Sequence, residues 1–169
     1  MPYQYQPVWK NVSPELAAEI TEFWRQEKAL PKGSDADGRA QQVVAIMRDG
    51  NGAIAALSSA VPGVVPRLRQ VLYCYRTLCA AEHRGKHTSF TMLQLSQKAL
   101  LEYNQSLAQP EAIGIFMEIE NRMIADHYNE AFWPRTGFSV IGYSPRGLVL
   151  RAYDFPGFKL LPPAKAGAD

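Results

Sequence analysis

The stretch from Val71 to Leu101 constrains the fold of this 169-residue chain more than any other. Its first part, Val71 to Ala81, is apolar and rich in β-branched and aromatic residues, which predicts a buried strand. Its last part, Thr88 to Leu101, carries apolar residues at helical spacing and predicts an amphipathic helix. The polar, basic segment Glu82 to Ser89 lies between them. The stretch therefore predicts a strand and a helix joined by a short basic loop.

Such a loop can bind an anion, because the free backbone N–H groups and the positive end of the helix dipole point into it. Arg84 and Lys86 add positive charge, and Thr88 or Ser89 can cap the helix. An ordinary turn with a solvated basic patch explains the same residues, since basic turns that contain glycine are common. The residues alone leave both interpretations open.

The composition is typical of one globular domain. Of the 169 residues, 47% are hydrophobic and 20% are charged, and the formal net charge is +2. This small charge, without a long Lys/Arg run, argues against nucleic acid as a partner. No apolar run approaches the roughly 20 residues of a membrane span, and the N-terminus lacks the basic-then-apolar order of a signal peptide. We therefore expect a cytoplasmic protein with a single domain over residues 1–161 and a mobile tail over 162–169.

The two cysteines, Cys74 and Cys79, fall on the same expected strand at an odd separation. Their side chains should point to opposite faces, so we expect free thiols, which suit a reducing cytoplasm. The three histidines are His83, His87 and His127, and their spacing indicates no metal site.

The other elements follow from residue spacing and from turn residues. Ser13-Pro14-Glu15 predicts a helix start, and Asp49-Gly50-Asn51-Gly52 predicts a hairpin turn. We expect further strands over 3–9, 42–47, 53–61, 112–119, 138–142 and 148–153, helices over 13–29 and from 121 to about 132, a loop over 30–39, and a break in the chain at Pro62, Gly63 and Pro66. Antiparallel strands precede strand–helix units, which is typical of an α/β or α+β protein with a mixed sheet.

The basic loop, Arg84-Gly85-Lys86-His87-Thr88-Ser89, resembles the Q/R-x-x-G-x-G/A loop of the GNAT superfamily of acyl-CoA N-acyltransferases. Arg84 matches the first position. His87 stands where the family usually has glycine, and Ser89 stands where it has glycine or alanine. Glycine matters in such a loop because backbone can then approach phosphate with no Cβ in the way.

A second segment, Phe132 to Phe138, resembles the family's Leu-Tyr-x-x-x-Gly-Phe at the end of a helix, with Trp133 at the tyrosine position. The resemblance extends over residues Gln41 to Tyr153. It implies a central mixed, mostly antiparallel sheet flanked by helices. It also implies that two strands, here 71–81 and 112–119, splay apart to admit a CoA thioester.

The resemblance further implies that acetyl-CoA is the acyl donor, that no metal is needed, and that the acceptor is a small-molecule or peptide amine. Backbone groups at the end of the first splayed strand would hold the pantetheine arm and polarise the thioester carbonyl, and the loop would hold the CoA pyrophosphate. The implied CoA-binding residues are Leu78, Cys79, Ala80, Arg84, Gly85, Lys86, His87, Thr88 and Ser89.

Acyl transfer to an amine needs a base for the amine and a proton for the departing thiolate. Glu118 and Glu120 lie two residues apart at the end of an expected strand, so both can point to one face. They are candidates for a general base or for holding a cationic acceptor. Solvated carboxylates at the point where the strand emerges are the alternative interpretation.

Tyrosines supply the other candidates. Tyr128 is the candidate proton donor, because the indole N–H of Trp133 is not a useful acid. Tyr73 and Tyr75 share one face of their strand and are candidates to line an acceptor pocket, with core packing as the alternative.

The resemblance thus implies an acyl-CoA-dependent N-acyltransferase that uses acetyl-CoA. The alternative is a GNAT-like binding module that has lost catalysis and holds CoA or another anion, and the residues His87 and Trp133 at motif positions favour it. The oligomeric state is left open, with a homodimer as one option.

Overall fold

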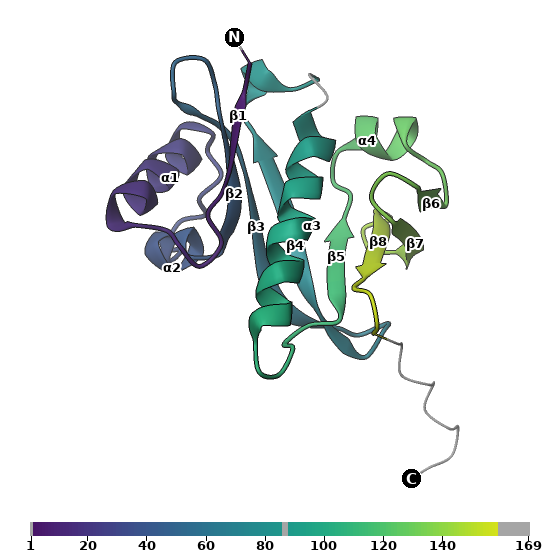
Figure 1. Ribbon diagram of the computed structural model, residues 1–169. Coiled ribbons are helices and arrows are strands. Elements are labelled where there is room, and N and C mark those ends of the chain that lie inside the picture. The colour runs from purple at the N-terminus through teal and green to yellow at the C-terminus, as the bar shows by residue number, and fades with distance from the viewer. Residues whose placement is uncertain (1, 86–87, 159–169) are drawn as a thin grey trace, which may run out of the picture. The chain divides into compact units, whose positions relative to one another are not determined.

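The computed structural model describes residues 2–85 and 88–158. Lys86, His87 and the expected tail over 162–169 lie outside the described residues. In chain order the elements are β1 (Gln4–Pro7), α1 (Pro14–Gln26), α2 (Ala36–Ala40), β2 (Val43–Arg48), β3 (Ile54–Val65), β4 (Gln70–Cys79), the 3-10 turn η1 (Ala81–His83), α3 (Thr88–Ser106), β5 (Gly114–Glu118), α4 (Arg122–His127), β6 (Phe132–Trp133), β7 (Phe138–Tyr143) and β8 (Val149–Asp154) (Figure 1).

The strands follow the order β1-β2-β3-β4-β5-β8-β7-β6 in one eight-stranded sheet. β4 and β5 pair in parallel, whereas β1–β2, β2–β3, β5–β8, β7–β8 and β6–β7 pair antiparallel. The parallel ladder joins Tyr73 to Ile115 and Cys74 to Phe116, although β4 continues to Cys79. The prediction of a mixed, mostly antiparallel sheet with helices is therefore confirmed.

The chain forms two compact units. The first comprises Met1–Val61 and Tyr75–Ser106, and the second comprises Pro62–Cys74 and Leu107–Asp169. Both β3 and β4 contribute residues to each unit. A single domain over residues 1–161 stays a prediction.

In the first unit, β2 is buried on both of its faces. Ile46 packs in one apolar cluster with the α1 side chains Ile20, Phe23 and Trp24. Met47 packs in another cluster with Met92 of α3. Because both faces are covered, β2 is a continuous apolar run and not an alternating one.

Two local signals in the sequence are confirmed. The Ser13 side chain caps α1 and accepts a hydrogen bond of 3.1 Å from the Leu16 N–H, with proline at the start of the helix. In the turn between β2 and β3, Asp49 Oδ1 accepts from the N–H groups of Asn51 at 2.9 Å and Ala53 at 3.0 Å.

Two expectations about loops are wrong. The segment expected to be a loop over residues 30–39 contains most of α2, whose N-cap Asp35 accepts from the Gly38 N–H at 2.9 Å. β3 runs through Pro62 and Gly63 to Val65 instead of breaking there. Much of that end of the strand is exposed, which is where proline is tolerated in a sheet. A Cβ on Gly63 would lie 3.2 Å from Cys74 Sγ, so close approach favours glycine.

The expected helix from residue 121 to about 132 is also wrong in extent. It ends at His127, and Phe132 and Trp133 form β6, which pairs with β7. Gly137, at φ +77°, is therefore the last residue of the turn between β6 and β7 and does not end a helix. Aromatic residues favour strands when a pairing partner is available, and β7 supplies that partner here.

Candidate functional site

The basic loop begins where β4 ends, in the first unit. The Ala80 N–H donates to the Ala55 carbonyl at 2.9 Å, and the His83 N–H donates to the Ala80 carbonyl at 3.0 Å as the chain turns. Arg84 is exposed, and its Nε donates to the Cys79 carbonyl at 3.1 Å. The side chain of Arg84 is thereby held against the last residue of β4, at the point where the resemblance implies the thioester.

The His83 side chain connects this turn to other parts of the first unit. Its Nδ1 shares a hydrogen bond of 2.9 Å with the Tyr3 hydroxyl, and the two rings meet edge to face. Its Nε2 lies 3.4 Å from Glu82 Oε1 and 4.0 Å from Asp49 Oδ2. The turn before the loop thus contacts Tyr3, which directly precedes β1, and lies close to the β2–β3 hairpin.

Gly85 has φ +77°, a conformation that L side chains rarely adopt. A Cβ there would meet nothing within 4 Å, so conformation and not space requires glycine at this position. Thr88 begins α3 and is buried, and Ser89 is exposed. Lys86 and His87, the remaining loop residues of the expected site, lie outside the described residues.

The other implied CoA-binding residues lie at the end of β4. Leu78 packs against the α1 cluster and Cys79 against the Met92 cluster, both half-buried, and Ala80 is buried. Cys79 and Cys74, the 2 cysteines of the chain, form no disulfide.

Tyr73 and Tyr75 are interior side chains. Tyr73 is fully buried, donates to Glu111 Oε1 at 2.7 Å and contacts the Phe155 ring. Tyr75 is buried as well, and this burial raises the pKa of its hydroxyl. Their positions support the core-packing alternative over an acceptor pocket.

Glu118 and Glu120 converge on one cation in the second unit. Arg146 Nη2 lies 3.0 Å from Glu118 Oε1 and 3.0 Å from Glu120 Oε1. Arg146 donates hydrogen bonds to Glu120 and Glu118, and these bonds raise the pKa of Arg146. The Glu118 side chain is 28% exposed and the Glu120 side chain 64%, so Glu118 is the more sheltered carboxylate. The common face expected from their spacing is present.

Tyr128 lies at the end of α4. Its backbone carbonyl accepts hydrogen bonds from Trp133 Nε1 at 2.9 Å and from Arg151 Nη2 at 3.0 Å. Trp133, at the position where the resemblance expects tyrosine, is buried and contacts the Tyr128 and Phe138 rings. The indole therefore has a structural role in the second unit.

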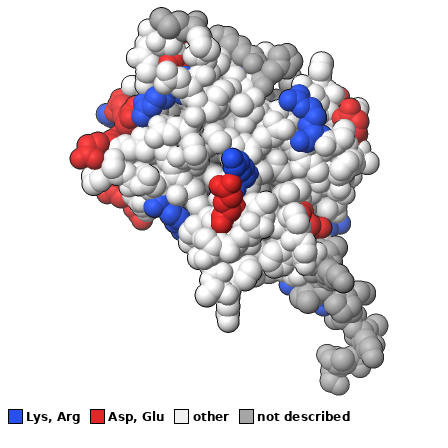
Figure 2. Space-filling model, in the orientation of Figure 1, with Lys and Arg blue, Asp and Glu red and all other residues white. Residues whose placement is uncertain are grey.

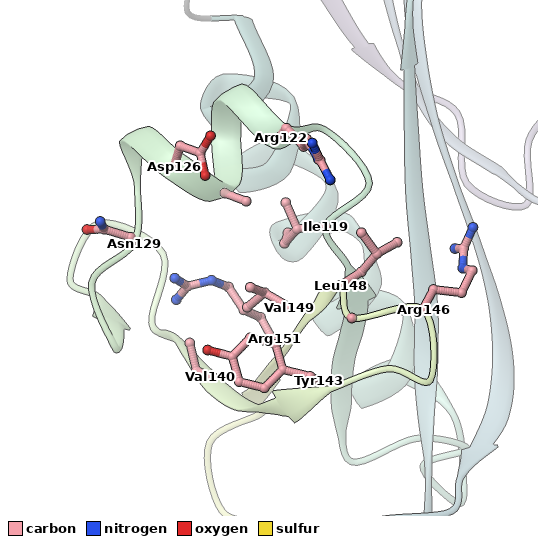
Figure 3. A pocket seen from close by; sticks show the side chains of 12 residues that line it. Ile119, Arg122, Asp126, Asn129, Val140, Tyr143, Arg146, Leu148, Val149 and Arg151 are labelled. Atoms are coloured by element: carbon pink, nitrogen blue, oxygen red, sulfur yellow. The ribbon is translucent and has the colours of Figure 1, made fainter.

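Sequence reasoning missed a cavity of about 330 Å³ in the second unit and the buried Arg151 on its wall. Figure 3 shows the cavity beside α4 and the β7–β8 hairpin. Its lining residues are Ile119, Arg122, Ala125, Asp126, Asn129, Val140, Tyr143, Arg146, Gly147, Leu148, Val149 and Arg151. An arginine in a short strand normally faces solvent, so its sequence position carried no signal.

Charged side chains are dispersed. Figure 2 shows Lys/Arg and Asp/Glu in small groups of both signs, with no broad basic area among the described residues of that face. In the described part of the chain, no helix has both the length and the apolar character needed to cross a membrane. Residues 2–85 and 88–158 also contain no group of three or more His, Cys, Asp or Glu side chains placed to hold a metal ion.

Comparison with known proteins gives matches in structure only. No protein-family profile matches the chain, and no curated protein matches its sequence. The ribosomal-protein-S5-alanine acetyltransferase of Vibrio fischeri matches with a TM-score of 0.61 at 13% identity, over 93% of this chain and 95% of that one. Arabidopsis thaliana NAA60, solved in complex with acetyl-CoA, matches with a TM-score of 0.59 at 12% identity, over 92% and 100%.

A GNAT-family acetyltransferase of Streptococcus pneumoniae matches with a TM-score of 0.56 at 13% identity, over 91% of this chain and 100% of that one. At such identities the likeness shows the fold alone.

Proposed function

From the premise that this chain has the GNAT fold, we propose that the protein is an acyl-CoA-dependent N-acyltransferase with acetyl-CoA as donor. The main support for the proposal is the arrangement of β4, the basic loop and α3. There Arg84 is held at the end of the strand, and Gly85 takes a conformation that favours glycine, just before a helix of 19 residues. The likeness to acetyltransferases over more than nine-tenths of the chain supports it.

In this proposal the loop binds the CoA pyrophosphate. Arg84 supplies a guanidinium, which suits phosphate oxygens, and the first N–H groups of α3 supply further donors. Gly85, Lys86, His87, Thr88 and Ser89 complete the loop. Backbone groups of Leu78, Cys79 and Ala80 hold the pantetheine arm and polarise the thioester carbonyl.

The acceptor in this proposal is a cationic amine. Two carboxylates, Glu118 and Glu120, face one guanidinium, that of Arg146, so one negative charge remains to attract an ammonium group. Glu118 or Glu120 takes one proton from the ammonium group, and the neutral nitrogen attacks the thioester carbonyl carbon. When the tetrahedral adduct collapses, the C–S bond breaks and Tyr128 gives its proton to the departing CoA thiolate. The second proton leaves the nitrogen of the adduct and restores the Tyr128 hydroxyl.

A catalytically inactive CoA-binding module is the second candidate. One observation favours it: Trp133, which replaces the family's tyrosine, is buried and donates to a backbone carbonyl. Such a module would bind CoA without transferring the acyl group.

An acyl-transfer assay distinguishes the two candidates. Release of free CoA thiol from acetyl-CoA is followed with a panel of primary amines, including diamines and peptide N-termini. We expect at least one cationic amine to stimulate release, and Glu118→Gln to lower kcat/KM by about 10²-fold or more. Glu102→Gln, which changes an exposed carboxylate on α3, is the matched control and should leave kcat/KM unchanged.

Acetyl-CoA binding without thiol release for any amine would favour the binding module. Unchanged rates in both Glu118→Gln and Glu120→Gln would remove these carboxylates from the mechanism. Tyr128→Phe tests the proton donor separately, because it should lower kcat for release of the CoA thiol while leaving the KM for acetyl-CoA unchanged.

A further inference from the structure

The cavity of the second unit shares Arg146 with the acceptor region proposed above, but the proposed reaction uses none of its other lining residues. It lies beside α4, the end of β5 and the β7–β8 hairpin, and Figure 3 shows the Arg151 side chain extending into it from β8. Only 2% of Arg151 is exposed. A charge this deeply buried is costly to the fold unless its hydrogen-bonding groups are satisfied.

The hydrogen bonds of Arg151 are only partly satisfied. Its Nη2 donates to the carbonyls of Tyr128 at 3.0 Å and Glu130 at 2.7 Å, and its guanidinium stacks 3.8 Å from the centre of the Trp133 ring. Nε and Nη1 are buried and have no hydrogen-bond partner. Because a guanidinium carries five N–H groups, three of them are left to bind an acceptor.

The surroundings of Arg151 favour an anion. Arg122 and Asn129 also line the cavity and can donate, whereas Asp126 is the acid on its wall. Arg146, a further cation on the lining, is engaged by Glu118 and Glu120. Two arginines of the lining, Arg122 and Arg151, are therefore balanced by one carboxylate, that of Asp126. The exposed Glu130 does not line the cavity, and its charge favours the protonated form of Arg151.

The rest of the wall favours a carboxylate over inorganic phosphate. Ile119, Val140, Leu148 and Val149 give it an apolar part, which suits the short hydrocarbon body of an organic acid. A volume of about 330 Å³ is at the low end for small-molecule sites and fits a ligand of amino-acid size.

We propose that this cavity is a binding site for a small organic carboxylate. The carboxylate accepts hydrogen bonds from the Nε and Nη1 groups of Arg151, and its hydrocarbon part lies against the apolar wall. Arg122 and Asn129 contribute further donors at the same site.

Ligand binding at this site can be followed by NMR through Trp133, because the Trp133 ring stacks on Arg151 and the indole N–H is hydrogen-bonded. The chain has 3 tryptophans, and the other two, Trp9 and Trp24, belong to the first unit and act as internal controls. Sodium butyrate is titrated into ¹⁵N-labelled full-length protein while the indole N–H and arginine Nε–H resonances are recorded. Butyramide serves as the neutral isostere and inorganic phosphate as the competing anion.

We expect butyrate to shift the Trp133 and Arg151 resonances saturably, while Trp9 and Trp24 stay in place and butyramide has no effect. Arg151→Met should weaken butyrate binding by on the order of tenfold or more, since charge-assisted hydrogen bonds are lost. Arg25→Met, which changes an exposed arginine on α1, should leave binding unchanged.

Val140→Phe keeps Arg151 and fills the cavity, so it tests the site even if Arg151→Met does not fold. It should abolish binding. Three results would each overturn the proposal. They are resonance shifts with butyramide equal to those with butyrate, no shift at a butyrate concentration of about 100 mM, near the weakest affinity of interest, and unchanged butyrate binding in Val140→Phe. Saturable binding of phosphate alone would overturn the carboxylate assignment.

Discussion

At the scale of single residues, two arginines illustrate how differently this chain compensates a charge. Arg48 forms a two-pronged pair with Glu19, with Nη2 to Oε2 at 2.9 Å, and also donates to the Gly52 carbonyl at 2.8 Å. That pair raises the pKa of Arg48 and lowers the pKa of Glu19. Arg151 instead donates to two backbone carbonyls, and its burial lowers its pKa. The Arg48–Glu19 pair stabilises the fold modestly. The burial of Arg151 is better explained by the ligand site proposed above.

The Glu19–Arg48 pair should make stability depend on pH. Glu19→Gln should lower the free energy of unfolding at pH 7 by about 0.5 kcal/mol, because the pair is partly exposed and screened. Since the folded-state pKa of Glu19 lies below its unfolded value, the contribution is complete above the unfolded pKa and is lost as pH falls through the folded one.

Urea denaturation from pH 7 down to pH 3 measures this effect, and the stabilities of wild type and Glu19→Gln should converge at the acid end. Glu102→Gln is the control, because Glu102 is exposed and its pair with Lys98 is long, at 3.8 Å. A Glu19→Gln difference that stays constant over this pH range would contradict the assignment.

At the scale of elements, the start of α1 shows how far local signals decide a boundary. The Ser13 Oγ accepts from the Leu16 N–H at 3.1 Å, so all the determinants lie within four residues. Ser13→Ala should lower the free energy of unfolding by about 1 kcal/mol, and Ser13→Asp, which keeps an acceptor, should restore most of it. Chemical denaturation checks both variants, and equal stability of Ser13→Ala and wild type would show that the cap contributes nothing.

Elements set by distant partners could not be predicted in the same way. Phe132 and Trp133 form a strand because β7 pairs with them and Arg151 stacks on the indole, and neither partner is visible locally. The same holds within the candidate site. Spacing predicted that Glu118 and Glu120 would share a face, but Arg146, which holds both, lies 28 and 26 residues away.

At the scale of the whole molecule, the order of strands and helices was the predictable part. Apolar runs, caps and the hairpin turn indicated a mixed sheet, and the structure has one. The three solved structures compared above are only 12–13% identical to this chain, so packing preserves this fold while individual residues change. The cavity at Arg151 depends on tertiary packing and has no sequence signature.

The proposed function depends on CoA binding by the loop after β4, which calorimetric titration with acetyl-CoA and with free CoA can measure. We expect both ligands to bind in the micromolar range and Arg84→Ala to weaken the binding of both by about tenfold or more. Lys98→Ala, which removes a charge further along α3, should leave both affinities unchanged. Absence of heat from either ligand at millimolar concentration, or equal affinity in wild type and Arg84→Ala, would contradict CoA binding by this loop.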